Sequence, residues 1–130
     1  MNLSLYSKIG FFTATLEVGE GFFLKNNQRA DFQITFDGLV PQGVLTVQIP
    51  AGFSLLASKV PQQGRLETDL NLHAQPQAKA YLFVNGSWTQ HTRRPAAWTG
   101  FGGEPVLAVA EGFFFYSPEA ITWTRSFFIP

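Results

Sequence analysis

The chain has 130 residues, of which 45% are hydrophobic and 14% charged, with nine basic residues, nine acidic residues and no cysteine. One domain is the default at this length, and this composition excludes a disordered chain. No basic run is longer than Arg93-Arg94, so nucleic-acid binding is not expected. Without cysteine, disulfide frameworks, thiol catalysis and Cys-based zinc sites are excluded.

Two kinds of segment that would direct the chain to a membrane or out of the cell are not found in the sequence. No apolar run approaches the ~18 residues of a membrane span, so membrane insertion is not expected. The stretch from Met1 to Lys8 lacks a basic region followed by an apolar one, so no secretory signal is predicted in this chain.

Helix signals are poor, and the first predicted elements are strands. From Asp31 to Asp37 apolar and polar residues alternate, which predicts a strand with one buried face. The same period of two recurs in the stretch that contains Leu45, Val47 and Ile49. A short strand is predicted next, from Phe53 to Ala57.

A β-hairpin is predicted around Asn85-Gly86, which lies between the stretches 81–84 and 87–92. Asn-Gly is the preferred pair for a two-residue type I′ turn, because both positions need a positive φ. His91 is expected on the exposed side of this hairpin.

The remaining segments complete an all-β chain. An interior strand is predicted from Phe113 to Tyr116 and a final strand from Ile121 to Ile129, in which Trp123 and Arg125 share the buried face. Segment 65–72 fits either a strand or one short helical turn, and the Gly-rich segment 93–103 predicts a long loop. The predicted fold is an antiparallel β-sandwich or barrel-like module with Greek-key or meander connections.

An internal repeat relates the two ends of the chain. The stretch from Leu16 to Leu24 matches the stretch from Leu107 to Phe115, a shift of 91 residues that also aligns Phe36 with Phe127. The interpretation is that residues 39–130 form a complete β module and that residues 1–38 are the C-terminal half of another.

The half module has a physical consequence, because a truncated sheet leaves backbone N–H and C=O groups unpaired along an edge. Three solutions are open. The half module docks on the complete module to give a single domain, it receives a strand from a neighbouring subunit, or the chain is part of a longer protein.

Several short motifs, taken in order, support a resemblance to a known class. They are Val40-Pro41-Gln42-Gly43, the stretch from Gly52 to Gln62, the stretch from Leu66 to Leu70, Glu111-Gly112-Phe113-Phe114 and Thr122-Trp123-Thr124-Arg125. In these motifs the chain resembles small, secreted, functionally uncharacterised β-rich proteins of environmental bacteria that carry tandem modules. The resemblance covers nearly all of residues 16–130 and implies an extracellular or cell-surface location, with no catalytic residues to carry over.

Glu20 and Glu111 occupy equivalent repeat positions, and each precedes a glycine. They could be paired carboxylates for acid–base chemistry or calcium. We favour a structural turn, in which each carboxylate accepts backbone hydrogen bonds and Gly21 or Gly112 adopts an unusual φ. His73 and His91 are the only histidines, so neither a metal site nor a cofactor is expected.

Exposed aromatic side chains would be suited to stacking on sugar rings. Trp98 lies in the Gly-rich segment and is expected to be exposed. Together with Trp88 and Phe101 it defines a candidate carbohydrate-binding site, whereas aromatic residues that only fill a core are the more common case.

The leading functional hypothesis is a non-enzymatic structural subunit that forms a homo-oligomer or homopolymer, as a filament or surface layer, through strand pairing. Low charge favours such association. The alternative is a carbohydrate-binding module with a polysaccharide partner. The candidate assembly contacts are Leu3, Leu5, Tyr6, Phe11, Phe12, Trp123, Phe127, Phe128 and Ile129.

Overall fold

The computed structural model describes residues 2–7, 10–15, 19–31, 33, 35–37 and 39–130. Within these ranges the chain forms twelve strands, and every strand pairing is antiparallel. The described ranges contain no helix of the length and apolarity that crossing a membrane would require. The predicted all-β antiparallel fold is confirmed, and because the sheets are open the barrel alternative is excluded.

The strands follow one another along the whole chain. In chain order they are β1 (Asn2–Ser7), β2 (Gly10–Thr15), β3 (Thr35–Asp37), β4 (Gly43–Ile49), β5 (Gly52–Ala57), β6 (Gly64–Arg65), β7 (Lys79–Val84), β8 (Ser87–Arg93), β9 (Trp98–Gly100), β10 (Val106–Leu107), β11 (Gly112–Ser117) and β12 (Ile121–Phe127).

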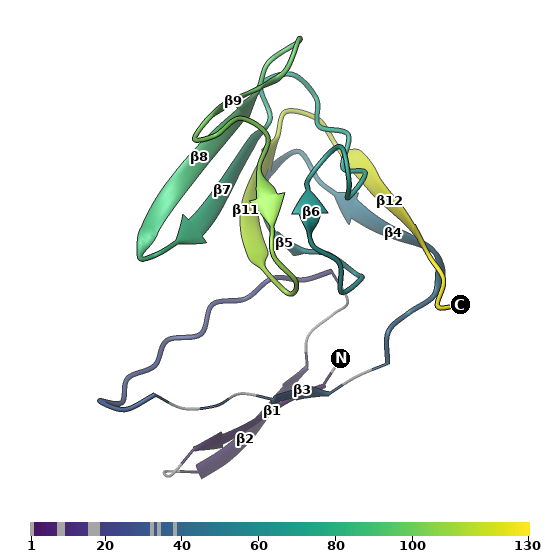
Figure 1. Ribbon diagram of the computed structural model, residues 1–130. Coiled ribbons are helices and arrows are strands. Elements are labelled where there is room, and N and C mark those ends of the chain that lie inside the picture. Colours follow the sequence, from purple (N-terminus) through teal and green to yellow (C-terminus); the bar gives the residue numbers. More distant parts are fainter. Residues whose placement is uncertain (1, 8–9, 16–18, 32, 34, 38) are drawn as a thin grey trace.

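The main core lies between a five-stranded sheet, ordered β5-β11-β7-β8-β9, and a two-stranded ribbon, β12-β4 (Figure 1). Phe113 from the sheet and Trp123 from the ribbon meet edge to face, with their ring centroids 6.2 Å apart. Trp123 is buried, as predicted. The buried apolar residues of the core are Ile49, Leu56, Leu66, Leu70, Leu72, Ala74, Ala78, Ala80, Leu82, Trp98, Leu107, Phe113, Phe115 and Trp123.

The two layers share a folded pair of strands. The ribbon pairing ends with Ile121 opposite Ile49, and the pairing of β5 with β11 begins with Ser117 opposite Gly52. Both segments of the pair therefore turn a corner between the layers. One turns at Pro50-Ala51, between β4 and β5, and the other turns at residues 118–120, between β11 and β12. A sheet corner of this kind lets one antiparallel pair contribute to both sides of a core.

The predicted hairpin is confirmed between β7 and β8. Asn85 and Gly86 have φ values of 49° and 79°, as a type I′ turn needs. β9 continues the meander on the far side of β8. Segment 93–103 is therefore not entirely a loop as predicted, because β9 pairs with the end of β8.

The predicted final strand is shorter than expected, because β12 ends at Phe127 rather than at Ile129. β4 and β5 match their predictions, and β11 is interior between β5 and β7. Of segment 31–37 only Thr35–Asp37 is a strand, and Phe32 and Ile34 lie outside the described residues. Segment 65–72 is a hydrogen-bonded turn in which the N–H of Asp69 donates to the carbonyl of Arg65.

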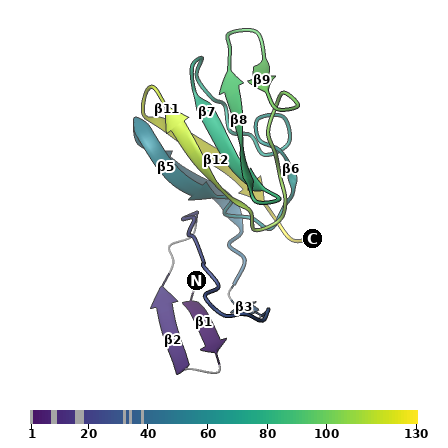
Figure 2. The same cartoon turned by 90° about the vertical axis from the view of Figure 1, so that its left-hand side faces the viewer.

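The first three strands form a separate small sheet in the order β2-β1-β3. Among the described residues these strands pair only with one another. Figures 1 and 2 both show this sheet apart from the five-stranded sheet, with the segment after residue 18 running between the two.

Candidate functional site

The outer face of the five-stranded sheet, which points away from the core, carries a group of aromatic side chains. Alternation along β11 places Phe113 and Phe115 in the core, so Phe114 and Tyr116 point outward. We call the outward group the aromatic face. Its members are Phe53, Tyr81, Phe83, Trp88, Phe114 and Tyr116.

The rings of the aromatic face contact one another across strands. Phe53 lies 5.2 Å from Tyr116, and Trp88 lies 5.1 Å from Phe83 and 5.7 Å from Phe114, measured between ring centroids. Phe53, Phe83 and Trp88 remain 65%, 53% and 49% exposed. Exposed apolar groups clustered in this way, rather than scattered singly, make the aromatic face a candidate interaction surface.

A second feature is the outer edge of β4, which we call the β4 edge. Among the described residues β4 pairs only with β12, so its other side has no strand partner. Leu45, Val47 and Ile49 point to the core side, whereas Val44 is 68% exposed. The sequence of this strand, GVLTVQI, has neither charge nor proline. Charge and proline are two of the devices that normally protect an edge strand from pairing.

The expectation that Trp98 is exposed is wrong. Trp98 is 9% exposed, and its indole Nε1–H donates to the carboxylate of Glu67 at 2.8 Å. The same carboxylate accepts from Arg93 Nε at 2.9 Å. A buried indole needs an acceptor, and Glu67 provides it from a distant part of the sequence. Of the predicted sugar-binding residues, Trp88 and Phe101 are exposed and Trp98 is not.

His91 is buried rather than exposed as expected. Its Nδ1 lies 2.7 Å from the carbonyl oxygen of Gly103, and its Nε2 lies 3.4 Å from the hydroxyl of Thr89. The ring therefore fastens the segment after β9 to the inner face of β8. Within the described ranges there is no group of three or more His, Cys, Asp or Glu that could hold a metal ion.

The turn before β11 has the predicted carboxylate contact but not the predicted glycine conformation. The N–H of Ala108 donates to Glu111 at 2.7 Å. Gly21 and Gly112 do not have a positive φ. Positive φ values occur two residues earlier in each repeat, at Gly19 (96°) and Ala110 (63°).

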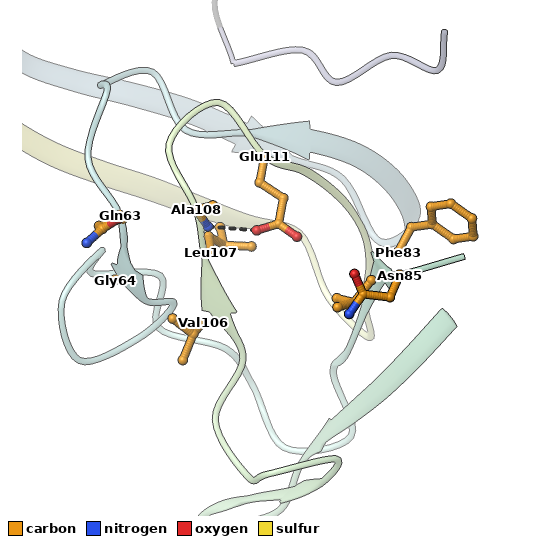
Figure 3. Close-up of a pocket in the computed structure, with 9 residues that line it drawn as sticks. Gln63, Gly64, Phe83, Asn85, Val106, Leu107, Ala108 and Glu111 are labelled. Carbon is orange, nitrogen blue, oxygen red and sulfur yellow. Dashed lines mark hydrogen bonds between the residues drawn. The ribbon is translucent and has the colours of Figure 1, made fainter. Parts of the chain in front are cut away.

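An open pocket of about 670 Å³ lies beside this turn (Figure 3). The carboxylate of Glu111 lies at its wall with one oxygen bonded to the N–H of Ala108, while the ring of Phe83 points outward. The lining residues are Gln63, Gly64, Phe83, Val84, Asn85, Val106, Leu107, Ala108 and Glu111.

The predicted assembly contacts fall in several different places. β12 is paired with β4, and its Thr124 carbonyl accepts a bond from the Asn71 side chain at 2.9 Å. Trp123 is inside the core, and Phe128 is exposed just beyond the end of β12. Leu3, Leu5 and Tyr6 lie in β1, Phe11 and Phe12 lie in β2, Phe127 ends β12, and Ile129 is exposed.

Arg125 holds the ribbon to the 62–70 segment. Its guanidinium donates to the carbonyl oxygen of Asp69 at 2.9 Å and to the side chain of Gln62. Burial lowers the pKa of the Arg125 guanidinium below its ordinary value. Trp123, on the same face of β12, donates from Nε1 to the carbonyl of Leu70 at 2.7 Å. This inner face of β12 is therefore engaged within the chain.

Comparisons with protein-family models, with curated proteins and with solved structures find no match for this chain. The resemblance to secreted tandem-module proteins therefore stays a prediction. The aromatic face and the β4 edge are the two features from which a function can be inferred.

Proposed function

We propose that the chain is a non-enzymatic structural subunit that assembles with copies of itself through strand pairing, at the cell surface or in an extracellular layer. The observation that carries the proposal is the β4 edge. Seven consecutive residues without charge or proline present, on the side away from β12, backbone groups that no strand among the described residues satisfies. Such an edge is a template for another strand.

The simplest pairing brings the β4 edge against the same edge of a second copy. If the two antiparallel strands are centred on Thr46, Leu45 of one copy lies opposite Val47 of the other, so the core-side faces stay aligned. Each backbone hydrogen bond contributes about 0.5–1.5 kcal/mol net. Association costs about 4–15 kcal/mol, so we expect assembly to depend strongly on concentration.

Introduction of a charge at the centre of this edge tests the proposal. Thr46→Lys places two ammonium groups opposite each other in the symmetric pairing, which is unfavourable. We expect wild-type protein to form large species in size-exclusion chromatography and negative-stain microscopy, and Thr46→Lys to reduce them at least tenfold. Thr122→Lys, the same change on the neighbouring strand, is the control. A strictly monomeric wild type at high concentration would contradict the proposal.

Carbohydrate binding is the second candidate, and the exposure of Trp88 beside Phe83 favours it. Aromatic rings on a sheet face can stack on sugar rings. Pull-down with insoluble polysaccharides should then retain the wild type and lose Trp88→Ala, while Phe101→Ala measures the contribution of the other exposed ring. Failure of every polysaccharide to retain the wild type would remove this candidate.

A further inference from the structure

The segment Gly19–Leu24, which we call the strap, leads from the edge of β5 to the aromatic face. The N–H of Ala57 donates to the carbonyl of Gly19 at 3.0 Å, and the N–H of Gly21 donates to Leu55 at 3.3 Å. Further along, the Phe23 ring lies 5.4 Å from Phe114. It also lies 5.9 Å from the ring of Trp88. The strap thus joins the edge of the sheet to its outer face.

The place where the strap sits accepts only glycine at its centre. A Cβ on Gly21 would lie 2.9 Å from Leu55 Cγ and 3.0 Å from the Leu56 carbonyl oxygen. Gly19 has a φ of 96°, and a Cβ there would lie 3.1 Å from the Val47 side chain. Backbone approach as close as this is a use of glycine that other residues cannot replace.

The strap contacts its own repeat equivalent. Gly21 corresponds to Gly112 and Phe23 to Phe114 at the shift of 91 residues. A Cβ on Gly112 would lie 3.8 Å from Gly21 Cα, and the two phenylalanine rings are in contact. The first copy of the Glu-Gly-Phe-Phe motif, in the strap, therefore packs against the second copy, in β11.

The strand pairing that joins the strap to β5 is short. Among the described residues its strand pairing with β5 is the one bridge between Glu20 and Leu56. Phe23 remains 59% exposed. The β1–β3 sheet that precedes and follows the strap has no described strand pairing with the main sheets. On the other side, the connection to β4 includes Leu39, which is 98% exposed.

We propose that the strap binds in trans, to the β5 edge and aromatic face of a second copy of this chain. This inference rests on the proposed self-assembly. One copy supplies the strap, and the next copy supplies the surface that binds it. The contacts made in trans are those made in cis, so concentration decides between them, as in domain swapping. Reciprocal exchange closes a dimer, and donation from each copy to the next builds an open filament.

Disulfide trapping distinguishes the two arrangements, because the chain has no cysteine of its own. The hydrogen bonds flank the Glu20–Leu56 pair rather than join it. Such a pair has Cα atoms about 4.5 Å apart, within the range for a disulfide. In Glu20→Cys/Leu56→Cys, oxidation should give covalent dimers and larger species on non-reducing gels, in a proportion that rises with concentration. Cross-linked monomer alone at every concentration would overturn the proposal.

A matched glycine pair provides a test that leaves the core unchanged. Gly21→Ala places its Cβ 2.9 Å from Leu55 Cγ and 3.0 Å from the Leu56 carbonyl oxygen, whereas Gly112→Ala meets only ordinary contacts at 3.6 Å and beyond. Because Gly21→Ala weakens the same contact in cis and in trans, we expect it to speed the exchange of subunits between assembled species at least threefold without lowering the assembled fraction, and Gly112→Ala to leave the exchange rate unchanged. Subunit exchange in Gly21→Ala as slow as in the wild type would overturn the proposal.

The same experiments separate the strap from the β4 edge. One possible result is that Thr46→Lys abolishes the large wild-type species while the cysteine variant forms only intrachain disulfides. This result would support the proposed function and overturn strap exchange. Interchain disulfides that persist in the Thr46→Lys background would support strap exchange independently of the β4 edge.

Discussion

At the scale of single residues, Glu67 joins groups that are far apart in the sequence. Its carboxylate accepts from Arg93 Nε and from Trp98 Nε1, and its side chain is 22% exposed. Glu67→Ala would leave a buried indole N–H and a largely buried guanidinium without their acceptor. We expect a loss of about 2–3 kcal/mol in the free energy of unfolding, measured by urea denaturation.

Glu119→Ala is the control for this change, because Glu119 is exposed and its side chain makes none of these contacts. Surface substitutions of that kind stay within about 0.5 kcal/mol. Equal urea midpoints for Glu67→Ala and the wild type would contradict the assigned role of the carboxylate.

Glu104 predicts a pH dependence of stability. Burial alone would raise the pKa of Glu104, but the N–H and hydroxyl of Thr68 and the N–H of Glu67 donate to its carboxylate at 2.7 Å. Together with the Arg65 charge these bonds leave the pKa below its ordinary value of 4.5. The Glu104 carboxyl group therefore binds a proton less tightly in the folded chain than in the unfolded chain.

The sign of the effect follows from linkage. Because the folded-state pKa is the lower one, the stabilisation is complete above pH 4.5 and is lost as the pH falls through the folded-state pKa. We expect Glu104→Gln to be about 1–2 kcal/mol less stable than the wild type at pH 7. The difference should shrink in acid, and parallel stability curves from pH 7 to pH 3 would contradict it.

Trp98 and His91 show where residue-level prediction from sequence fails. Local context predicts both residues to be exposed, from a glycine-rich segment for Trp98 and from a hairpin face for His91. Their burial is decided by partners 31 and 12 residues away, Glu67 and Gly103. Nothing in the local pattern carries that information.

At the scale of elements, the turn before β11 stores strain that a substitution can remove. Ala110 has a φ of 63°, where a Cβ is unfavourable, and glycine occupies the equivalent repeat position, Gly19. Ala110→Gly should therefore stabilise the chain by about 0.5–1 kcal/mol, although the more flexible unfolded chain offsets part of the gain. A higher melting temperature in calorimetry checks this, and a lower one would contradict it.

Elements with strong local signals were predictable. The Asn85-Gly86 turn fixes its hairpin by backbone conformation, and alternation along β4 and β12 identifies their core-side faces. The aromatic face was missed as a unit, because its six residues come from four strands whose order is set by non-local pairing. The available signal is that Phe113–Tyr116 is apolar on both faces, which predicts an interior strand but does not show that its outward residues join aromatic rings of neighbouring strands.

At the scale of the whole molecule, the described residues form one main core, and two exposed features lie outside it. The core closes through a corner shared by both layers, whereas the β4 edge and the aromatic face remain accessible in the described structure. Low charge weakens the repulsion between copies. Assembly through sheet edges is the physical consequence that we propose.

Hydrogen–deuterium exchange followed along a concentration series measures the pairing of β4 between subunits most directly. In a lone antiparallel pair, alternate amides of an edge strand point away from the partner and exchange quickly. We predict that protection of the amides in residues 43–49 rises with protein concentration, and that Thr46→Lys abolishes the rise. Protection of β4 that stays the same from dilute to concentrated protein would contradict assembly through this edge.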